Sequence, residues 1–212
     1  MKIGILGSGN VAKTLGTGFL KNNHEVMLGS RNIEKLKEWV ASNGERALSG
    51  NFSEVAKFGE IILICTLGEG ALEAINIAGI KNFKNKVVID VTNPLDFSKG
   101  FPPKLASNQG NSLAEQIQNT ISDAKVVKCF NTISANIMVN PNLEEGLATQ
   151  FIAGDNQEAK NIVKKLAEEF GWHIEDLGNL DLAYLLEAQA MIWITYGFKN
   201  NYWKHAFKLL KK

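Results

Sequence analysis

Three small residues near the start of the chain have the types and spacing that let a backbone approach a phosphate. Gly7, Gly9 and Ala12 form a Gly-x-Gly-x-x-Ala pattern directly after the mostly apolar run Met1–Leu6. Gly7 permits a tight turn off a strand, Gly9 leaves room for a pyrophosphate, and Ala12 allows close helix packing. Free N–H groups at the start of the following helix can then bind phosphates without a charged side chain. The loop predicted to hold a dinucleotide comprises Gly7, Ser8, Gly9, Asn10 and Val11.

The end of the second predicted strand favours a coenzyme with a 2′-phosphate. A site for NAD would carry Asp or Glu about 20 residues beyond the glycines, to bind the ribose 2′-hydroxyl. Gly29 and Ser30 stand there instead, followed by Arg31, whose planar guanidinium suits a phosphate. Lys35 lies one helical turn further on and can add a second positive charge. We therefore expect NADP(H); the alternative interpretation is that Arg31 is a solvated residue at a strand end.

Alternating strand and helix signals run along the chain and would position this loop. The expected strands are Met1–Leu6, Glu25–Leu28, Ile61–Cys65, Lys86–Val91, Lys125–Phe130, Thr149–Ala153 and His173–Asp176. The expected helices are Val11–Leu20, Ile33–Ala41, Ser53–Phe58, Glu69–Ala78, Leu113–Ile121 and residues 156–170, with caps at Asn32, Ser112 and Asp155. This alternation is typical of an α/β fold with a doubly wound, mostly parallel sheet, the Rossmann arrangement. A polar connection over residues 93–110 is long enough to be functional or mobile.

The last part of the chain combines helical spacing with many aromatic residues. One helix face would carry Leu182, Leu185, Leu186, Gln189, Ile192, Trp193 and Tyr196, and the helical spacing continues at Trp203, Phe207 and Leu210. We therefore place an NADP-binding Rossmann domain at residues 1–178 and a C-terminal helical segment at residues 179–212. That segment would cover the core, form a subunit interface or close over the nicotinamide.

Composition and charge exclude several classes of function. The net charge of +1 leaves no basic footprint for nucleic acid or for a lipid surface. The longest apolar tract, Leu180–Phe198, contains Asp181 and Glu187, which argues against a membrane span. The three histidines are scattered and lack the spacing of metal ligands. We expect no nucleic acid, membrane or metal partner.

The cysteines and the first residues bear on the compartment. Cys65 and Cys129 each lie inside an apolar, strand-like run, which favours two buried thiols in a reducing environment over a disulfide. The chain also begins directly with a strand rather than with the charged and apolar regions of a signal peptide. We therefore expect a cytoplasmic protein.

The reactive end of the site should lie beyond the carboxyl ends of the strands. The candidates are Thr66 and Leu67 after one strand, Thr92, Asn93, Pro94 and Leu95 after the next, and residues 131–135 after a third. This set lacks a nucleophile, a base and paired carboxylates, so no catalytic side chain is expected. Asp90 lies within a strand and is more typical of a structural residue. Hydride transfer between two ring systems needs less, because the protein only has to stack the rings and exclude water.

Several motifs, in order along almost the whole chain, resemble the NADP oxidoreductases dependent on coenzyme F420, a deazaflavin. They are Gly-Ser-Gly-Asn-Val at 7–11, His-Glu-Val-Met-Leu-Gly-Ser-Arg at 24–31, Asp-Val-Thr-Asn-Pro-Leu at 90–95, Val-Val-Lys-Cys-Phe-Asn-Thr-Ile-Ser-Ala at 126–135, Ala-Gly-Asp-Asn-Gln-Glu-Ala-Lys at 153–160 and Leu-Gly-Asn-Leu with Leu-Leu-Glu over 177–187. The chain is also similar to the cytosolic domain of the six-transmembrane metalloreductases, particularly over residues 130–135.

The resemblance implies a Rossmann domain with a small C-terminal helical portion, often a homodimer, that passes a hydride between NADPH and a deazaflavin or flavin. It assigns the pyrophosphate to residues 8–11, the 2′-phosphate to Ser30, Arg31 and Lys35, and the nicotinamide end to Thr66, Leu67 and Ala135. The chain departs from the deazaflavin reductases in one place, because Thr66 is followed by Leu67-Gly68 rather than by Pro and a bulky residue. The acceptor could therefore be F420, FMN or FAD.

Two other functions fit the residues. The first is an NADPH-dependent imine or small-carbonyl reductase on the same scaffold, with water or the coenzyme's surroundings as the proton source. The second is a module that senses NADP(H) without turning it over. Rapid NADPH oxidation only with a flavin or deazaflavin would indicate the flavin-type oxidoreductase. Turnover of an imine without a flavin would indicate the reductase, and tight NADP(H) binding with no acceptor would indicate the sensing module.

Overall fold

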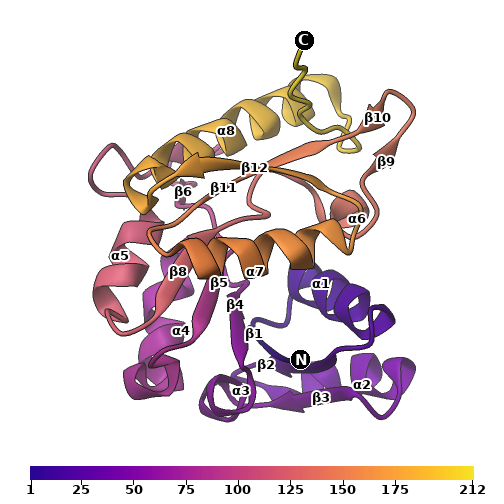
Figure 1. Ribbon diagram of the computed structural model, residues 1–212, viewed down its shortest axis with the longest axis vertical. Coiled ribbons are helices and arrows are strands. Elements are labelled where there is room, and N and C mark those ends of the chain that lie inside the picture. The colour runs from indigo at the N-terminus through magenta and orange to yellow at the C-terminus, as the bar shows by residue number, and fades with distance from the viewer.

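The computed structural model describes all 212 residues, built around a sheet of eight strands (Figure 1). The strands are β1 (Lys2–Leu6), β2 (Glu25–Gly29), β3 (Ala47–Gly50), β4 (Ile61–Ile64), β5 (Val87–Asp90), β8 (Lys125–Lys128), β11 (Thr149–Ala153) and β12 (His173–Gly178). Their spatial order is β12-β11-β8-β5-β4-β1-β2-β3, and all pairs from β3 to β8 are parallel. The first six strands thus follow the order 3-2-1-4-5-6 of dinucleotide-binding sheets, which confirms the predicted doubly wound Rossmann fold.

Helices cover both faces of the sheet and bury one apolar core on each. The first face is covered by α1 (Asn10–Lys21), α2 (Lys37–Asn43) and α7 (Gln157–Glu168), and the second by α3 (Phe52–Phe58), α4 (Ala71–Ala78), α5 (Leu113–Thr120) and the start of α8 (Ala183–Asn200). The cores alternate along each strand as the period of two requires, so Leu63 packs on one face and its neighbours Ile62 and Ile64 on the other. Figure 1 shows α8 lying across the β12 end of the sheet.

The last two strands reverse direction. β11 is antiparallel to β8 with Ala153 opposite Lys128, and β12 is parallel to β11. The start of β11 therefore lies beyond the carboxyl end of β8, where Thr132 Oγ1 donates to the side chain of Gln150 at 3.2 Å. Short helix α6 (Ala135–Met138) and the small hairpin of β9 (Asn142–Leu143) and β10 (Gly146–Leu147) connect the two strands.

The C-terminal prediction was correct for α8 and wrong for the residues after it. The helix ends at Asn200, and Asn201 takes a left-handed conformation with φ 47°. The rest of the chain is extended, because it bonds to the start of β11: Thr149 N donates to the Phe207 carbonyl at 2.8 Å, and Leu209 N donates to Thr149 Oγ1 at 3.1 Å. His205, Phe207 and Leu210 thus lie outside any helix.

The predicted apolar face of α8 was correct for Leu186 and Trp193 and wrong for Leu185, Ile192 and Tyr196. The buried positions are Ala183, Leu186, Glu187, Ala190, Trp193 and Gly197, whereas Leu185, Ile192 and Tyr196 are exposed. Apolar residues occur all around this helix, so their spacing does not define a single face. None of the helices combines the length and the apolar character needed to cross a membrane.

Smaller elements confirm some predicted caps and correct others. Ser112 and Glu115 form the predicted capping box of α5, and the side chain of Asn32 accepts from Glu34 N as predicted. α7 is capped by Asn156 rather than Asp155, whose carboxylate accepts from Leu180 N instead. Strand β3 was not predicted. The connection 93–110 contains a short hairpin of β6 (Leu95–Asp96) and β7 (Lys104–Leu105).

Candidate functional site

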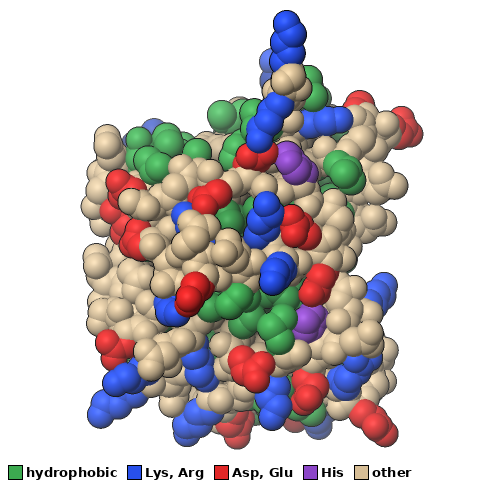
Figure 2. Space-filling view, viewed as in Figure 1, with side chains coloured by type: hydrophobic (Ala, Val, Ile, Leu, Met, Phe, Trp, Pro, Cys, Tyr) green, Lys and Arg blue, Asp and Glu red, His purple; other side chains and the backbone are tan.

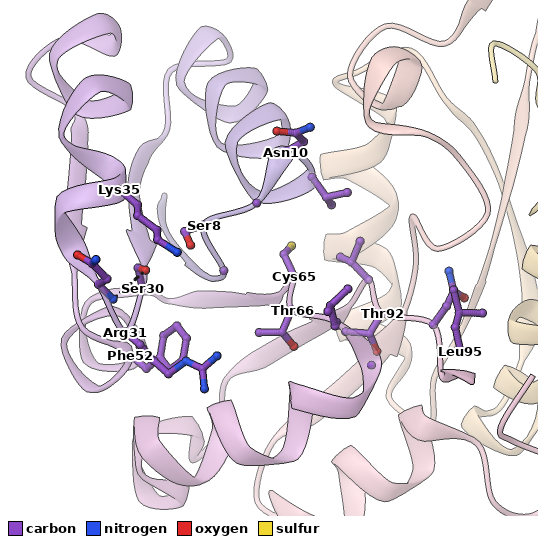
Figure 3. Close-up of a pocket in the computed structure, with 18 residues that line it drawn as sticks. Ser8, Asn10, Ser30, Arg31, Lys35, Phe52, Cys65, Thr66, Thr92 and Leu95 are labelled. Atoms are coloured by element: carbon purple, nitrogen blue, oxygen red, sulfur yellow. Dashed lines mark hydrogen bonds between the residues drawn. The ribbon is translucent and has the colours of Figure 1, made fainter. Parts of the chain in front are cut away.

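A cleft of about 570 Å³ opens at the carboxyl ends of β1, β2, β4 and β5. It straddles the neighbours β1 and β4, where the strand order reverses and where such sheets bind their ligands. Its lining comprises Gly7, Ser8, Gly9, Asn10, Val11, Ser30, Arg31, Asn32, Lys35, Phe52, Cys65, Thr66, Leu67, Gly68, Val91, Thr92, Asn93 and Leu95 (Figure 3). Every predicted site residue except Pro94 and residues 131–135 is in this set.

The glycine loop has the geometry that its residues predict. Gly7 has φ +152°, and a Cβ there would lie 2.5 Å from the Cys65 carbonyl oxygen, so only glycine fits between β1 and β4. Gly9 is the N-cap residue of α1, and a Cβ built on it meets no atom within 4 Å. The space above Gly9 is therefore open toward the cleft, beside the unpaired N–H groups of the first helical turn. This cradle fits a pyrophosphate.

The positive charge of the cleft is confined to one end, as Figure 3 shows on its left side. Arg31 and Lys35 are the charged residues of the lining, and both are exposed. Ser30 Oγ accepts from Asn32 N at 3.1 Å, which fixes the turn that carries them. Arg31 also lies 3.8 Å from Glu73 across a second cavity of about 380 Å³, which shares Phe52, Thr66 and Leu67 with the first.

The other end of the cleft is polar but uncharged. Thr66 Oγ1 is buried without a hydrogen-bond partner, which leaves a hydroxyl free for a ligand. Asn93 and Asn131 exchange hydrogen bonds, since Asn93 Nδ2 donates to the Asn131 carbonyl at 2.7 Å and Asn131 Nδ2 donates to Asn93 Oδ1 at 2.9 Å. Gly68 lies so close to Asn93 that a Cβ would stand 2.2 Å from its carbonyl oxygen. The ends of β4, β5 and β8 are thus held together at this edge.

The predicted residues outside the lining are Pro94 and residues 131–135. Pro94 is buried beneath Gly68, and its carbonyl accepts from Ala106 N at 2.8 Å. Ala135 begins α6, which packs against α1. The lining also contains Phe52, which carries no motif and enters from the start of α3, directly after the unpredicted strand β3. Cys65, Gly68 and Val91 are neighbours of predicted residues and follow from the strand-end rule.

The thiols are free, and burial changes their chemistry. Cys65 lies in the cleft lining, and burial, with a smaller contribution from the charge of Asp90, raises the pKa of its thiol far above the ordinary value. Burial also raises the pKa of Cys129. Both thiols are therefore protonated at neutral pH and do not act as nucleophiles. No group of three His, Cys, Asp or Glu side chains is arranged to hold a metal ion.

Sheet order, glycine loop and strand-end cleft together define a dinucleotide-binding Rossmann protein. The model of the family described as "NADP oxidoreductase coenzyme F420-dependent" matches residues 2–94. A crystal structure from Arthrobacter sp. FB24, described as a proposed F420-dependent NADP reductase, superposes with a TM-score of 0.94 at 33% identity and covers 100% of both chains. The chain therefore belongs to this family and is an NADP-dependent oxidoreductase.

Two curated relatives agree with this membership. The F420-dependent NADP reductase of Methanocaldococcus jannaschii is 28% identical over 94% of this chain and 93% of its own length. The rat metalloreductase STEAP3 is 30% identical over 88% of this chain, which spans only 36% of that protein.

Proposed function

We propose that the protein transfers a hydride between NADP(H) and a planar acceptor, the deazaflavin F420 or a flavin such as FMN or FAD. The observation that carries this proposal is the distribution of groups in the cleft. Its only charged residues, Arg31 and Lys35, lie at one end, and its lining contains no Asp, Glu, His or Tyr. Reduction of a plain ketone needs a proton donor beside the reacting carbon, whereas transfer between two rings does not.

The same distribution supports one orientation of the coenzyme. Arg31, Lys35 and Ser30 would bind the 2′-phosphate, and the start of α1 would bind the pyrophosphate beside Gly9. The nicotinamide would then reach the uncharged end, where the unpartnered hydroxyl of Thr66 can hydrogen-bond its amide. The bound coenzyme supplies the hydride; the protein binds it, orients it and excludes water.

Exposed aromatic rings support a planar acceptor at that end. Phe97 follows the cleft residue Leu95 by two positions, and its ring centroid is 5.3 Å from that of Phe101. Phe101 is 71% exposed and lies 5.5 Å from Phe198 of α8. Rings left open to solvent in the segment that follows the cleft residues offer stacking surface to a deazaflavin or an isoalloxazine. The similarity to the F420-dependent NADP reductase of Methanocaldococcus jannaschii favours F420.

The decisive experiment mixes purified protein and NADPH with F420, FMN and FAD in separate stopped-flow runs. We expect NADPH oxidation only when an acceptor is present. Phe101→Ala should raise the KM for the acceptor and leave the Kd for NADPH unchanged. The control Ile80→Ala, at an exposed residue before the amino end of β5 and outside the cleft lining, should change neither. Turnover of an imine without any flavin would refute the proposal in favour of an imine reductase. NADPH binding with no turnover by any acceptor would indicate a sensing module.

We also propose that residues 179–212 form the interface of a homodimer. Leu185, Ile192 and Tyr196 are exposed on α8, and Lys199 is the one charged residue exposed along this helix. In Figure 2, charges of both signs are interspersed over most of the surface, while hydrophobic side chains gather along the upper margin, over α8. Light scattering should show a dimer that Ile192→Glu converts to a monomer and Ile80→Glu does not; a monomeric parent protein would refute this.

The compartment is a further proposal. Both cysteines are free thiols, as is usual in reducing surroundings, which supports the cytoplasmic location expected from the sequence.

A further inference from the structure

A fully buried lysine stands directly behind the uncharged end of the cleft. Lys128, at the end of β8, is 0% exposed and lies between two carboxylates that are also 0% exposed. Its Nζ is 2.7 Å from Asp90 Oδ2 and 3.1 Å from Glu187 Oε1. Nothing in the proposed hydride transfer uses these three groups.

The first arm of this cluster holds Thr92, a residue of the cleft lining. Lys128 Nζ donates to the Thr92 carbonyl at 2.6 Å. Asp90 Oδ1 accepts from Thr92 N at 2.9 Å and from Thr92 Oγ1 at 2.7 Å. Every polar group of Thr92 is therefore bonded to this ion pair, which fixes both the backbone and the side chain of the residue.

The second arm reaches the segment beyond the cleft. Glu187 on α8 accepts from Leu113 N, in the first turn of α5, at 3.0 Å, and from the hydroxyl of Ser107, near the end of the 93–110 connection. The positive end of the α5 dipole offsets the excess negative charge of two carboxylates around one ammonium. Through Lys128 and Glu187, hydrogen bonds thus link Thr92 in the cleft lining to α8 and to the 93–110 connection.

Stability alone gives little reason for such a cluster. A buried ion pair loses much of its attraction to the cost of desolvation, and well-packed apolar side chains often serve as well or better. What the cluster supplies that apolar residues could not is directed bonding to both backbone groups of Thr92. This points to a role in geometry.

We propose that Lys128 is a positioning residue that fixes Thr92 at the nicotinamide end of the cleft, with Glu187 linking this position to the 93–110 connection. The inference rests on the proposed function, because it concerns how the coenzyme is aligned. Lys128 touches neither reactant, and its effect would pass through the Thr92 backbone. Small errors in such alignment can reduce a transfer rate by roughly a hundredfold.

Lys160 provides a matched control. It is buried to 6% exposure, and its Nζ bonds to Asp176 Oδ1 at 3.0 Å and to the Gly178 carbonyl at 3.2 Å. Like Lys128, it thus bonds to a carboxylate and to a backbone carbonyl, although Lys128 has a second carboxylate partner. However, Lys160 lies on α7 beside the edge strand β12 and does not line the cleft.

The test compares Lys128→Met with Lys160→Met. Both should bind adenosine 2′,5′-bisphosphate like the parent protein, because the charged end of the cleft is unchanged. Only Lys128→Met should loosen the other end, seen as lower fluorescence anisotropy of the bound dihydronicotinamide and a fall of about tenfold or more in single-turnover reduction of F420. Equal anisotropy and equal rates in the two variants would overturn the proposal.

Two further measurements cover the case in which Lys128→Met does not fold. The double variant Lys128→Met/Glu187→Gln removes one charge of each sign and leaves Asp90 bonded to Thr92, and it should show the same two losses. In the parent protein the Thr92 amide should be among the slowest to exchange with solvent, and fast exchange would also overturn the proposal. A parent protein that binds neither NADPH nor the bisphosphate would instead refute the proposed function.

Discussion

Gly9 allows coenzyme binding to be separated from folding by a single methyl group. The Cβ of Gly9→Ala would meet no atom within 4 Å, and its φ of −79° and ψ of −178° are ordinary extended values for alanine. Alanine is a poorer N-cap than glycine, by about 0.5–1 kcal/mol. It also restricts the unfolded chain, which returns roughly 0.4–1 kcal/mol. These terms nearly cancel, so we expect the Tm to stay within about 2 °C of the parent value.

The expected loss of coenzyme binding is much larger. The added methyl would fill the space proposed for the pyrophosphate and move it away from the N–H groups of α1. A hydrogen bond to a charged group contributes about 1.5–3 kcal/mol, so losing one or two amounts to roughly 3 kcal/mol. At 1.4 kcal/mol per tenfold change, the Kd for NADPH should rise by about a hundredfold or more.

The assay is a fluorescence titration with NADPH and a thermal melt of the same sample. Gly7→Ala serves as the contrast, because its φ of +152° and the 2.5 Å approach to the Cys65 carbonyl oxygen make the same methyl costly to the fold. Gly7→Ala should therefore lower the Tm clearly. If Gly9→Ala binds NADPH as the parent protein does, or melts like Gly7→Ala, the assignment of the pyrophosphate to this loop is wrong.

Two further predictions concern charge and thiol chemistry. Arg31→Ala should raise the Kd for NADPH by about tenfold and leave the Kd for NADH unchanged. The expected loss lies at the low end of the roughly 1.5–3 kcal/mol range for a charged hydrogen bond, because the Arg31 side chain is exposed. Equal losses of affinity for both coenzymes would exclude contact with the 2′-phosphate. Because burial raises the pKa of Cys65 and Cys129, the neutral thiols persist as the pH rises, so labelling by a disulfide reagent should stay slow from pH 7 to 9 in the native protein and become fast on unfolding. Labelling of the folded protein at a rate close to that of the unfolded chain would contradict this.

The coenzyme half of the cleft could be predicted from the sequence because its residues act through local geometry. Gly7 and Gly9 have roles set by the turn itself, and Arg31 follows a strand whose end the glycine motif locates. Phe52 could not be found in this way. It reaches the cleft because β3 pairs with β2 and delivers the start of α3 there, and the short run Ala47–Gly50 shows neither alternation nor a continuous apolar stretch.

Residues that depend on contacts distant in the sequence were missed for the same reason. The face of α8 was assigned from apolar spacing, yet Glu187 is buried because Lys128 and the start of α5 satisfy its charge. A usable signal was present: Asp90, Lys128 and Glu187 each have an apolar residue on both sides in the sequence. Charges of opposite sign in that setting can be buried only together.

The tail after Asn201 shows the limit of periodicity. Trp203, Phe207 and Leu210 are spaced as in a helix, but the chain after Asn201 instead forms one hydrogen bond to the Thr149 backbone and one to its hydroxyl. This partner exists because β11 runs opposite to β8, and the direction of a strand is not encoded in its own residues.

A cleft charged at one end only also sets an order of events. When the adenylate half of the coenzyme is bound at the charged end, its nicotinamide ring forms one side of the remaining space. The ring of the acceptor can stack there only after the nicotinamide is in place. We therefore expect a compulsory-order mechanism, in which the coenzyme binds before the acceptor and dissociates last. Initial-rate patterns showing random addition would mean that the second reactant finds its own foothold on the protein.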